Sequence, residues 1–347
     1  MKKGDKVLVT GGTGYIGSHT VVELQQKGFD VIIADNFSNS SESVIDSIEK
    51  ITGKRPVFEF TELCEREQTQ SLFKKHKDLK AVIHFAAFKA VGESVENPLL
   101  YYKNNIFSLV NVLEAMKEIE IPNLVFSSSC TVYGQPDKLP VDENTPLQKS
   151  SSPYGETKQM SEKIISDTVK ATFLNSISLR YFNPTGAHDS AMIGELPIEK
   201  PNNLVPFITQ TAVGKRDELQ VFGGDYNTPD GTCIRDYIHV VDLAKAHLIA
   251  LERLMDNKNK SKNEIFNLGT GIGYSVLDTI HSFERVSGEK LNYKIVQRRP
   301  GDVEKIYADT TYANKELNWK AERDLDNMML TAWKWELALN QKTNTPA

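Results

Sequence analysis

The stretch that decides the fold is Val7-Leu8-Val9-Thr10-Gly11-Gly12-Thr13-Gly14-Tyr15-Ile16-Gly17, near the start of the chain. An apolar run typical of a buried strand leads into a glycine-rich loop, and a helical pattern follows. Two glycine spacings fit a dinucleotide fingerprint: Gly12, Gly14 and Gly17, or Gly11, Gly14 and Gly17. Glycine lets the backbone approach a pyrophosphate at a helix N-terminus, where N–H groups and the helix dipole favour an anion. The stretch therefore predicts a dinucleotide site, and the alternative is a tight turn without a ligand.

Asp35 ends the second apolar run, 18 residues beyond Gly17. A carboxylate at this position accepts hydrogen bonds from the adenosine ribose and repels a 2′-phosphate. We therefore expect NAD rather than NADP as the cofactor. The alternative is that Asp35 or Asn36 only caps a turn or helix.

Short apolar runs alternate with longer amphipathic stretches up to about residue 185, which predicts an α/β fold with a doubly wound parallel (Rossmann) sheet. The expected strands are 7–9, 31–34, 57–60, 81–85, 124–126 and 177–179, and the expected helices include 17–28, 42–52, 109–119 and 155–170. Proline and glycine then punctuate shorter elements, before a helix at 240–254 and a strand at 265–268. We expect an NAD-binding domain at 1–185, with returning segments near 235–268. A smaller, mixed α/β substrate domain should occupy 186–347.

Composition excludes several classes of function. The chain has 347 residues and a formal net charge of −5, without a polybasic run, so nucleic-acid binding is not expected. No apolar run approaches the ~18 residues of a membrane span. Three scattered cysteines show neither metal-site spacing nor a disulfide framework, which favours a reducing cytoplasm. Asp236, His239 and Asp242 are better explained by capping and packing than by a metal site.

Tyr154 and Lys158 are four residues apart, so on a helix they share one face. An ammonium about 5 Å away lowers the pKa of a phenol by about two units at an effective dielectric near 20. A second cation, such as an oxidised nicotinamide, would bring that pKa to about 7. The phenol would then act as a base toward a sugar hydroxyl, and Ser129, at the end of a predicted strand, would bind the same hydroxyl. The alternatives are that the serines ending at Ser129 only form a turn, and that Tyr154 and Lys158 are an ordinary pair on the protein surface.

Gly11–Gly17, Ser129, Tyr154 and Lys158 resemble the extended short-chain dehydrogenase/reductase family. Longer strings are similar to the UDP-hexose 4-epimerases within that family, and they span nearly the whole chain. These strings are 14–20, 89–95, 180–184, 201–204 and 235–240. The resemblance implies an isomerase that interconverts UDP-glucose and UDP-galactose. It inverts C4 through a transient 4-keto sugar and regenerates tightly bound NAD in each turnover.

The resemblance also implies site residues, carried over position by position. Tyr154, Lys158 and Ser129 would be catalytic. The implied cofactor contacts are Gly11, Gly14, Tyr15, Ile16, Gly17, Asp35, Asn36, Glu62, Leu63, Phe85, Ala86, Ala87, Lys89, Asn104, Tyr154, Lys158 and Tyr181. The implied substrate contacts are Lys89, Ser129, Thr131, Tyr154, Phe182, Asn183, Asn203, Leu204, Phe222, Arg235, Arg299, Asp302 and Ile306. The guanidinium groups suit a diphosphate, although Arg235 and Asp236 could instead form an internal ion pair.

The chain departs from the family at two positions. Glu62 replaces the usual aspartate near adenine, which puts the contact to the adenine amino group in doubt. Cys130 stands where small residues are common beside the catalytic serine, and we interpret it as a packing residue.

Three alternatives stay open beside the UDP-glucose reaction. A nucleotide-sugar 4,6-dehydratase needs an Asp-Glu pair after the catalytic hydroxyl, but Cys130-Thr131 and Val132-Tyr133 supply no carboxylate. A silent NAD-sensing or scaffold protein would typically lose the tyrosine or the lysine. A UDP-N-acetylglucosamine or dual-specificity epimerase depends on Ile306, which aligns with the family's gate and is intermediate in size. We expect N-acetylated sugars to be minor substrates. The family also implies a homodimer packed through helices at about 95–120 and 154–171.

Overall fold

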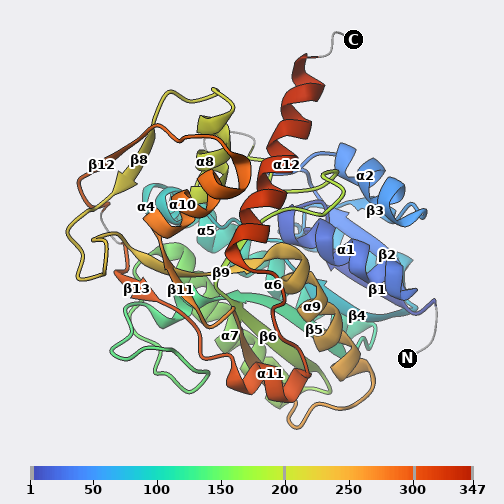
Figure 1. Cartoon of the computed structure of the whole chain (residues 1–347). Coiled ribbons are helices and arrows are strands. Elements are labelled where there is room, and N and C mark those ends of the chain that lie inside the picture. Colours follow the sequence, from blue (N-terminus) through green and yellow to red (C-terminus); the bar gives the residue numbers. More distant parts are fainter. Residues whose placement is uncertain (1–3, 198–200, 300–301, 345–347) are drawn as a thin grey trace.

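The computed structural model describes residues 4–197, 201–299 and 302–344. A seven-stranded sheet forms its centre, in the order β10-β6-β5-β4-β1-β2-β3. Every neighbouring pair in it is parallel, as predicted. The strands are β1 (Lys6–Thr10), β2 (Asp30–Asp35), β3 (Val57–Phe60), β4 (Leu79–His84), β5 (Asn123–Ser129), β6 (Asn175–Tyr181) and β10 (Asn263–Leu268). Figure 1 labels the strands of this sheet from β6 to β3. β10 comes from far along the chain and pairs with β6, so a late segment completes the sheet.

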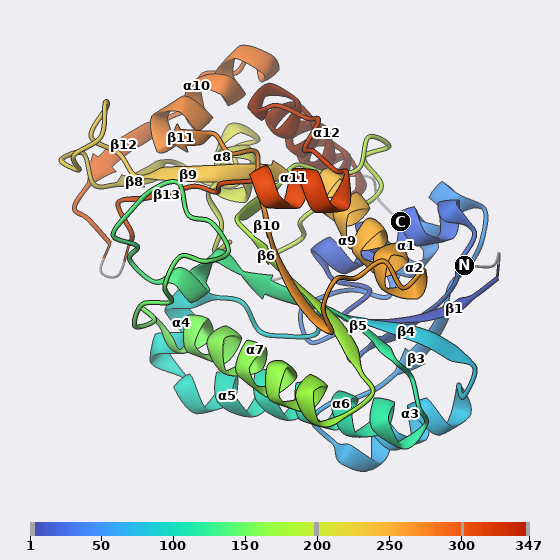
Figure 2. The same ribbon diagram turned by 90° about the horizontal axis from the view of Figure 1, so that it is seen from below.

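Helices cover both faces of this sheet, which is the expected doubly wound arrangement. Figure 2 shows α3, α5, α6 and α7 on one side and α1, α2 and α9 on the other. The first group comprises α3 (Arg66–Lys75), α4 (Val91–Glu96), α5 (Pro98–Tyr102), the π-helix η1 (Lys103–Phe107), α6 (Ser108–Glu118) and α7 (Pro153–Ala171). The second comprises α1 (Tyr15–Lys27), α2 (Ser43–Thr52), α9 (Val240–Met255) and α11 (Thr311–Leu317).

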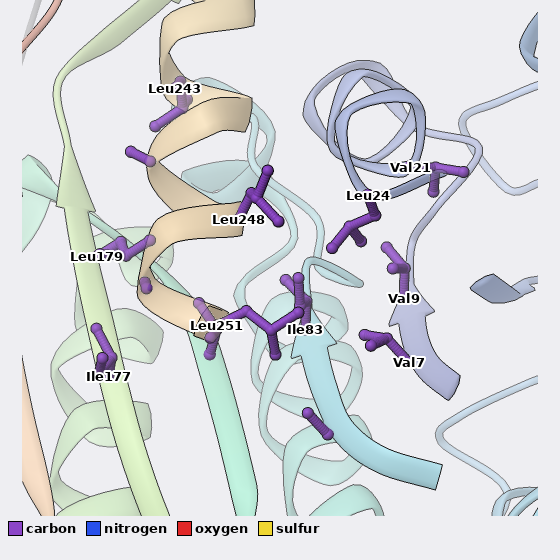
Figure 3. Close-up of a cluster of buried hydrophobic side chains, with 14 of the residues drawn as sticks. Val7, Val9, Val21, Leu24, Ile83, Ile177, Leu179, Leu243, Leu248 and Leu251 are labelled. Atoms are coloured by element: carbon purple, nitrogen blue, oxygen red, sulfur yellow. The ribbon is translucent and has the colours of Figure 1, made fainter. Parts of the chain in front are cut away.

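The two faces follow from side-chain alternation along the strands, whose period is two. In β1, Val7 and Val9 belong to the core under α1 and α9, whereas Leu8 belongs to the core under α6 and α7. Figure 3 shows the first of these cores, where leucines of α1 and α9 meet the valines and isoleucines of β1, β4 and β6. Near-continuous apolar runs are therefore needed in the strands, because both faces are buried.

The rest of the chain builds smaller sheets beside the carboxyl ends of the large one. β9 (Ile234–His239) pairs with β7 (Asn183–Thr185), β11 (Gly273–Ser275) and β13 (Lys305–Ile306), and β8 (Leu219–Phe222) pairs with β12 (Tyr293–Val296). α8 (Leu204–Ala212), α10 (Val276–Ser287) and α12 (Leu325–Asn344) pack over them around a separate apolar core. Over the described ranges, no helix has both the length and the apolar character that crossing a bilayer requires.

Candidate active site

A cleft of about 1140 Å³ opens at the carboxyl ends of the central strands. This is where open parallel sheets bind their ligands, and the volume exceeds the ~300–1,000 Å³ typical of a pocket for one small molecule. Most residues singled out in the sequence line it: Gly11, Gly14, Tyr15, Ile16, Gly17, Asp35, Asn36, Glu62, Leu63, Phe85, Ala86, Ala87, Lys89, Asn104, Ser129, Thr131, Tyr154, Lys158, Tyr181, Phe182, Asn183 and Asn203. Six others are outside this lining: Leu204, Phe222, Arg235, Arg299, Asp302 and Ile306.

The glycine-rich loop joins β1 to α1 and is shaped by backbone contacts. Gly11 has a φ of 67°, and a Cβ there would lie 2.8 Å from the nitrogen of Ala86. A Cβ on Gly17 would collide with the carbonyl oxygen of Gly11. Gly14 caps α1 without a side-chain hydrogen bond, so the helix N-terminus faces the cleft with backbone N–H groups. This cradle fits the pyrophosphate of a dinucleotide.

Asp35, at the end of β2, is fastened to the same loop. Its Oδ2 accepts a hydrogen bond from the Thr13 nitrogen at 3.1 Å, and its Oδ1 accepts one from the Phe37 nitrogen at 3.0 Å. Asn36 donates its side-chain N–H to Oε2 of Glu62 at 2.8 Å. Oε1 of Glu62 accepts from the Cys64 nitrogen at 3.1 Å. The Glu62 carboxylate thus binds both Asn36 and the backbone of the turn that follows Glu62.

The catalytic candidates meet where β5 ends and α7 begins. Ser152 caps α7 by accepting from the Gly155 nitrogen at 3.2 Å, which sets Tyr154 and Lys158 in the first turns. The Lys158 Nζ donates to the carbonyl oxygen of Ser127 at 2.7 Å and lies 5.9 Å from the centroid of the Tyr154 ring. Ser129, Tyr154 and Lys158 are all buried along the cleft wall.

Electrostatics at this point differ from the sequence-based expectation of an acidified phenol. Burial raises the pKa of Tyr154, although a hydrogen bond with Ser129 acts in the opposite direction. Burial also lowers the pKa of Lys158 to about 8, against the raising effect of Glu162. Both shifts have the same cause, because removal from water disfavours the charged form of either group. Burial therefore opposes the acidification of the phenol that the spacing of Tyr154 and Lys158 predicts.

Four of the six residues outside the cleft lining form a cluster of their own. Arg299 donates two hydrogen bonds to Asp302, at 2.7 and 3.2 Å, and its guanidinium lies 5.8 Å from the Phe222 ring centroid. Arg235 lies 4.0 Å from the same carboxylate. Ile306 is buried separately against Cys130 and Phe182. Leu204 begins α8.

Arg235 does not pair with Asp236. The buried Asp236 carboxylate instead accepts from the backbone nitrogens of Thr270, Gly271 and Ala308, at 2.8, 3.0 and 3.2 Å. His239 caps α9 by accepting from the Val241 nitrogen. Asp242 pairs with Arg323. Among the described residues, no three histidines, cysteines or acidic residues gather as a metal site.

Glu195 is a cleft residue that the sequence reasoning missed. One oxygen of its carboxylate lies 3.0 Å from the Lys89 Nζ and accepts from the Asn203 Nδ2 at 2.6 Å. Its backbone oxygen accepts from the Trp335 indole at 2.8 Å. No local signal in the sequence indicates Glu195, because its partner Lys89 is 106 residues away.

Comparisons with known proteins bear on this site. A family model described as GDP-mannose 4,6 dehydratase matches residues 8–331. A UDP-glucose 4-epimerase from Drosophila melanogaster is 50% identical over 339 residues, which cover 95% of this chain and 96% of that protein.

Two solved structures are also similar over nearly their whole length. One is UDP-glucose 4-epimerase from Stenotrophomonas maltophila with bound NAD and formylated UDP-arabinopyranose. It has a TM-score of 0.93 and 47% identity, and covers 97% of this chain and 99% of that one. The other is the Bifidobacterium longum enzyme in complex with NAD⁺ and UDP, with a TM-score of 0.92 and 45% identity over 96% and 98% of the two chains.

Proposed function

The chain belongs to the family that the matching model describes and, within it, to the UDP-glucose 4-epimerases; on that premise we propose that it interconverts UDP-glucose and UDP-galactose. The reaction inverts C4 of the hexose through a transient 4-keto sugar. The observation that carries the proposal is the meeting of Tyr154, Lys158 and Ser129 beside a dinucleotide cradle in one cleft.

The protein's residues supply orientation and proton transfer. Gly11–Gly17 would hold the pyrophosphate of NAD, and Asp35 the adenosine ribose. When bound, NAD supplies the hydride acceptor and donor for C4. Tyr154 takes the proton of the 4-hydroxyl group and later returns it, while Ser129 hydrogen-bonds the same oxygen. Lys158 provides the positive charge beside the phenol and is fixed by Ser127.

The nucleotide end of the substrate would be held by the cluster of Phe222, Arg235, Arg299 and Asp302. Arg299 already presents its guanidinium fork in bidentate geometry to Asp302, a geometry that also suits a diphosphate. Phe222 is partly exposed and offers its ring as a flat surface for a base. Lys89, Asn183 and Asn203, which line the cleft, would contact the sugar and its linkage.

We propose that N-acetylated UDP-hexoses are minor substrates. Ile306 packs in one buried cluster with Cys130 and Phe182, which line the cleft, so its size would limit how far these two residues can move away from the sugar. The dehydratase alternative lacks support, because Cys130 and Thr131 follow Ser129 where the elimination needs carboxylates. The silent NAD-sensing or scaffold alternative is weakened by the presence of both Tyr154 and Lys158 in the cleft.

We also propose a homodimer. Exposed apolar side chains gather on α4, α5, η1 and α7, on the side that Figure 2 shows beneath the sheet. They are Val91, Val95, Leu99, Leu100, Phe107 and Met160, and Leu99 is 80% exposed. Apolar patches rimmed by polar residues mark association surfaces. The elements lie within the ranges 95–120 and 154–171, with α4 at their edge.

A cytoplasmic location is proposed from the cysteines. Cys64, Cys130 and Cys233 are free thiols, and two of them are buried. Unpaired cysteines are typical of proteins in reducing compartments.

The test is to incubate the purified protein with UDP-galactose without added NAD. We expect UDP-glucose to form, and the protein to carry nicotinamide absorbance from purification. Retained NAD without any change of the sugar would overturn the epimerase proposal in favour of the silent NAD-binding alternative.

A further inference from the structure

A buried ionic network lies behind the catalytic face of α7, and the proposed reaction does not use it. Glu162 is one helical turn beyond Lys158. Its Oε1 accepts from the Ser128 hydroxyl at 2.6 Å and from Arg180 Nε at 2.9 Å, and its Oε2 accepts from Arg180 Nη2 at 2.6 Å. All three residues are at most 8% exposed. The network is absent from the cleft lining, so substrate and cofactor do not explain it.

Lys158 and Glu162 are fastened to consecutive residues of the same strand. Lys158 donates to the Ser127 carbonyl at 2.7 Å, and Glu162 accepts from the Ser128 hydroxyl. Side chains four residues apart on a helix are neighbours, with Cβ atoms about 5–6 Å apart. The end of β5 therefore anchors both the ammonium and the carboxylate, and both side chains are buried.

Other titratable groups surround the Tyr154–Lys158 pair from four further elements. They are His84 on β4, Tyr181 on β6, Cys130 after β5 and Tyr101 on α5. Burial lowers the pKa of His84 to about 3 and raises those of Tyr181 and Cys130 to about 12. It also raises the pKa of Tyr101. All four are uncharged near neutral pH, and the charge of Arg180 is turned toward Glu162. Of these described neighbours, Glu162 is the one that supplies a negative charge beside Lys158.

We propose that Glu162 is a positioning residue of this epimerase: its carboxylate, held by Ser128 and Arg180, keeps the Lys158 amine in the ammonium form that Tyr154 requires. The inference rests on the proposed function, because the ammonium matters only if Tyr154 acts as the base. It extends the machinery by one turn of α7 and gives the buried ion pair a role other than stability.

The size of the effect follows from Coulomb's law. A unit charge about 6 Å away, at an effective dielectric near 20, shifts a neighbouring pKa by roughly two units. Arg180 keeps its charge when only Glu162 is changed, so removal of the Glu162 charge should lower the pKa of Lys158 by roughly one to two units from its value of about 8.

The experiment compares the pH dependence of kcat/KM for the holoenzyme, Glu162→Gln and Asp167→Asn. The alkaline limb reports the loss of the Lys158 proton in the free enzyme. We expect this limb to move about one to two pH units lower in Glu162→Gln. Asp167→Asn removes the same charge from an exposed position of α7, where the carboxylate pairs with Lys163, and should leave the limb unchanged. Coincident limbs in all three proteins would overturn the proposal.

A second readout does not depend on activity. In protein labelled with ¹³C-lysine, the resonance missing from Lys158→Met belongs to Lys158, and its titration midpoint should fall in Glu162→Gln. If the wild type fails to epimerise UDP-galactose, the proposed function fails, whereas this titration still reports whether Glu162 controls the lysine. An unchanged midpoint would count against Glu162 even in an active enzyme.

Two further variants separate charge from packing. Glu162→Gln leaves the Arg180 charge buried without its partner, which lowers the stability of the protein. The double variant Glu162→Gln/Arg180→Gln removes both charges. That double variant should shift the alkaline limb in the same direction by a smaller amount. Tyr133→Phe removes a hydrogen bond to Arg180 and no charge, so it should lower stability without moving the limb. A double variant that titrates like the wild type would refute the inference.

Discussion

The cofactor cradle and the cluster proposed for the nucleotide-sugar are built in opposite ways. The cradle is made by one short loop, whose glycines pack backbone against backbone and whose shape is fixed by contacts within the protein. The cluster brings together Phe222, Arg235, Arg299 and Asp302 from separate segments, and its charged groups pair with one another. The cradle would therefore bind its proposed ligand through backbone groups, whereas the cluster would have to exchange side-chain partners.

This difference has a physical consequence for binding. A preformed cradle loses little conformational entropy when a ligand enters, which favours a cofactor that stays through many turnovers. In the cluster, the proposed diphosphate would have to displace Asp302 from Arg299, so part of the binding free energy would be offset. Weaker, exchangeable binding is what a substrate that arrives and leaves requires.

The strongest test removes the group between the two regions and leaves both intact. Tyr154→Phe should lower turnover by roughly 10²–10⁴-fold, the range for loss of a general base, because the phenol is the group proposed to take the proton of the 4-hydroxyl. Initial rates with UDP-galactose measure it, and Tyr312→Phe, at an exposed position, is the matched control. Wild-type turnover in Tyr154→Phe, with NAD retained, would remove the phenol from the mechanism.

The next test breaks the cradle. In Gly17→Ala the new Cβ collides with the Gly11 carbonyl, and overpacking of about 1–3 kcal/mol should weaken NAD retention roughly 10–100-fold. The ratio of absorbance at 260 and 280 nm of the purified protein reports it. Gly92→Ala, where a Cβ meets nothing within 4 Å, is the control. Equal NAD content in Gly17→Ala and wild type would mean that the loop yields more easily than the geometry indicates.

A smaller effect is expected in the cluster. Arg299→Ala should raise KM about 5–30-fold with less change in kcat, because a charged hydrogen bond contributes about 1.5–3 kcal/mol and displacing Asp302 offsets part of it. Steady-state kinetics with UDP-galactose measures it. The neighbouring Arg298→Ala removes an exposed guanidinium paired with Asp225 and should leave KM near wild type. If both variants behave alike, Arg299 does not hold the diphosphate.

The smallest effect concerns the sugar end. Ile306→Val removes one methylene from the buried group beside Cys130 and Phe182. We expect the ratio of kcat/KM for UDP-N-acetylgalactosamine to that for UDP-galactose to rise about two- to fivefold. This is less than the roughly 10–200-fold that one methylene in direct contact with a substrate contributes, because Ile306 does not line the cleft. Competition assays with both sugars measure the ratio. An unchanged ratio would place the limit on sugar size elsewhere in the cleft.

Sequence patterns were sufficient where a signal is local. The strands under both helical layers are apolar runs, so β1, β2, β5 and β6 could be predicted, and the loop after β1 was placed by its glycines. The pairing of β10 with β6 was harder, since parallel strands distant in the chain leave no local mark. α3 was also difficult, because only Thr69, Leu72 and Phe73 are buried in an otherwise polar helix.

In the candidate site, too, local features could be predicted from the sequence, whereas features that depend on the whole fold could not. The spacing of Tyr154 and Lys158 predicts that they are neighbours, but it gives no measure of how dry their surroundings are. Burial shifts the pKa of both groups. This burial arises from β4, β5, β6 and α5 together. Glu195 could not be predicted for a similar reason, because its partner Lys89 lies 106 residues away in the chain.

The position of β10 in the sequence determines when the central sheet can be completed during synthesis. β6 has no neighbour on its outer side until residues 263–268 have been made, so a nascent or truncated chain ending near residue 185 would carry a bare parallel edge open to foreign strands. The nucleotide-binding half is consequently not a module that can be cut off, exchanged or expressed by itself, even though its chemistry is encoded almost entirely in the first half of the chain.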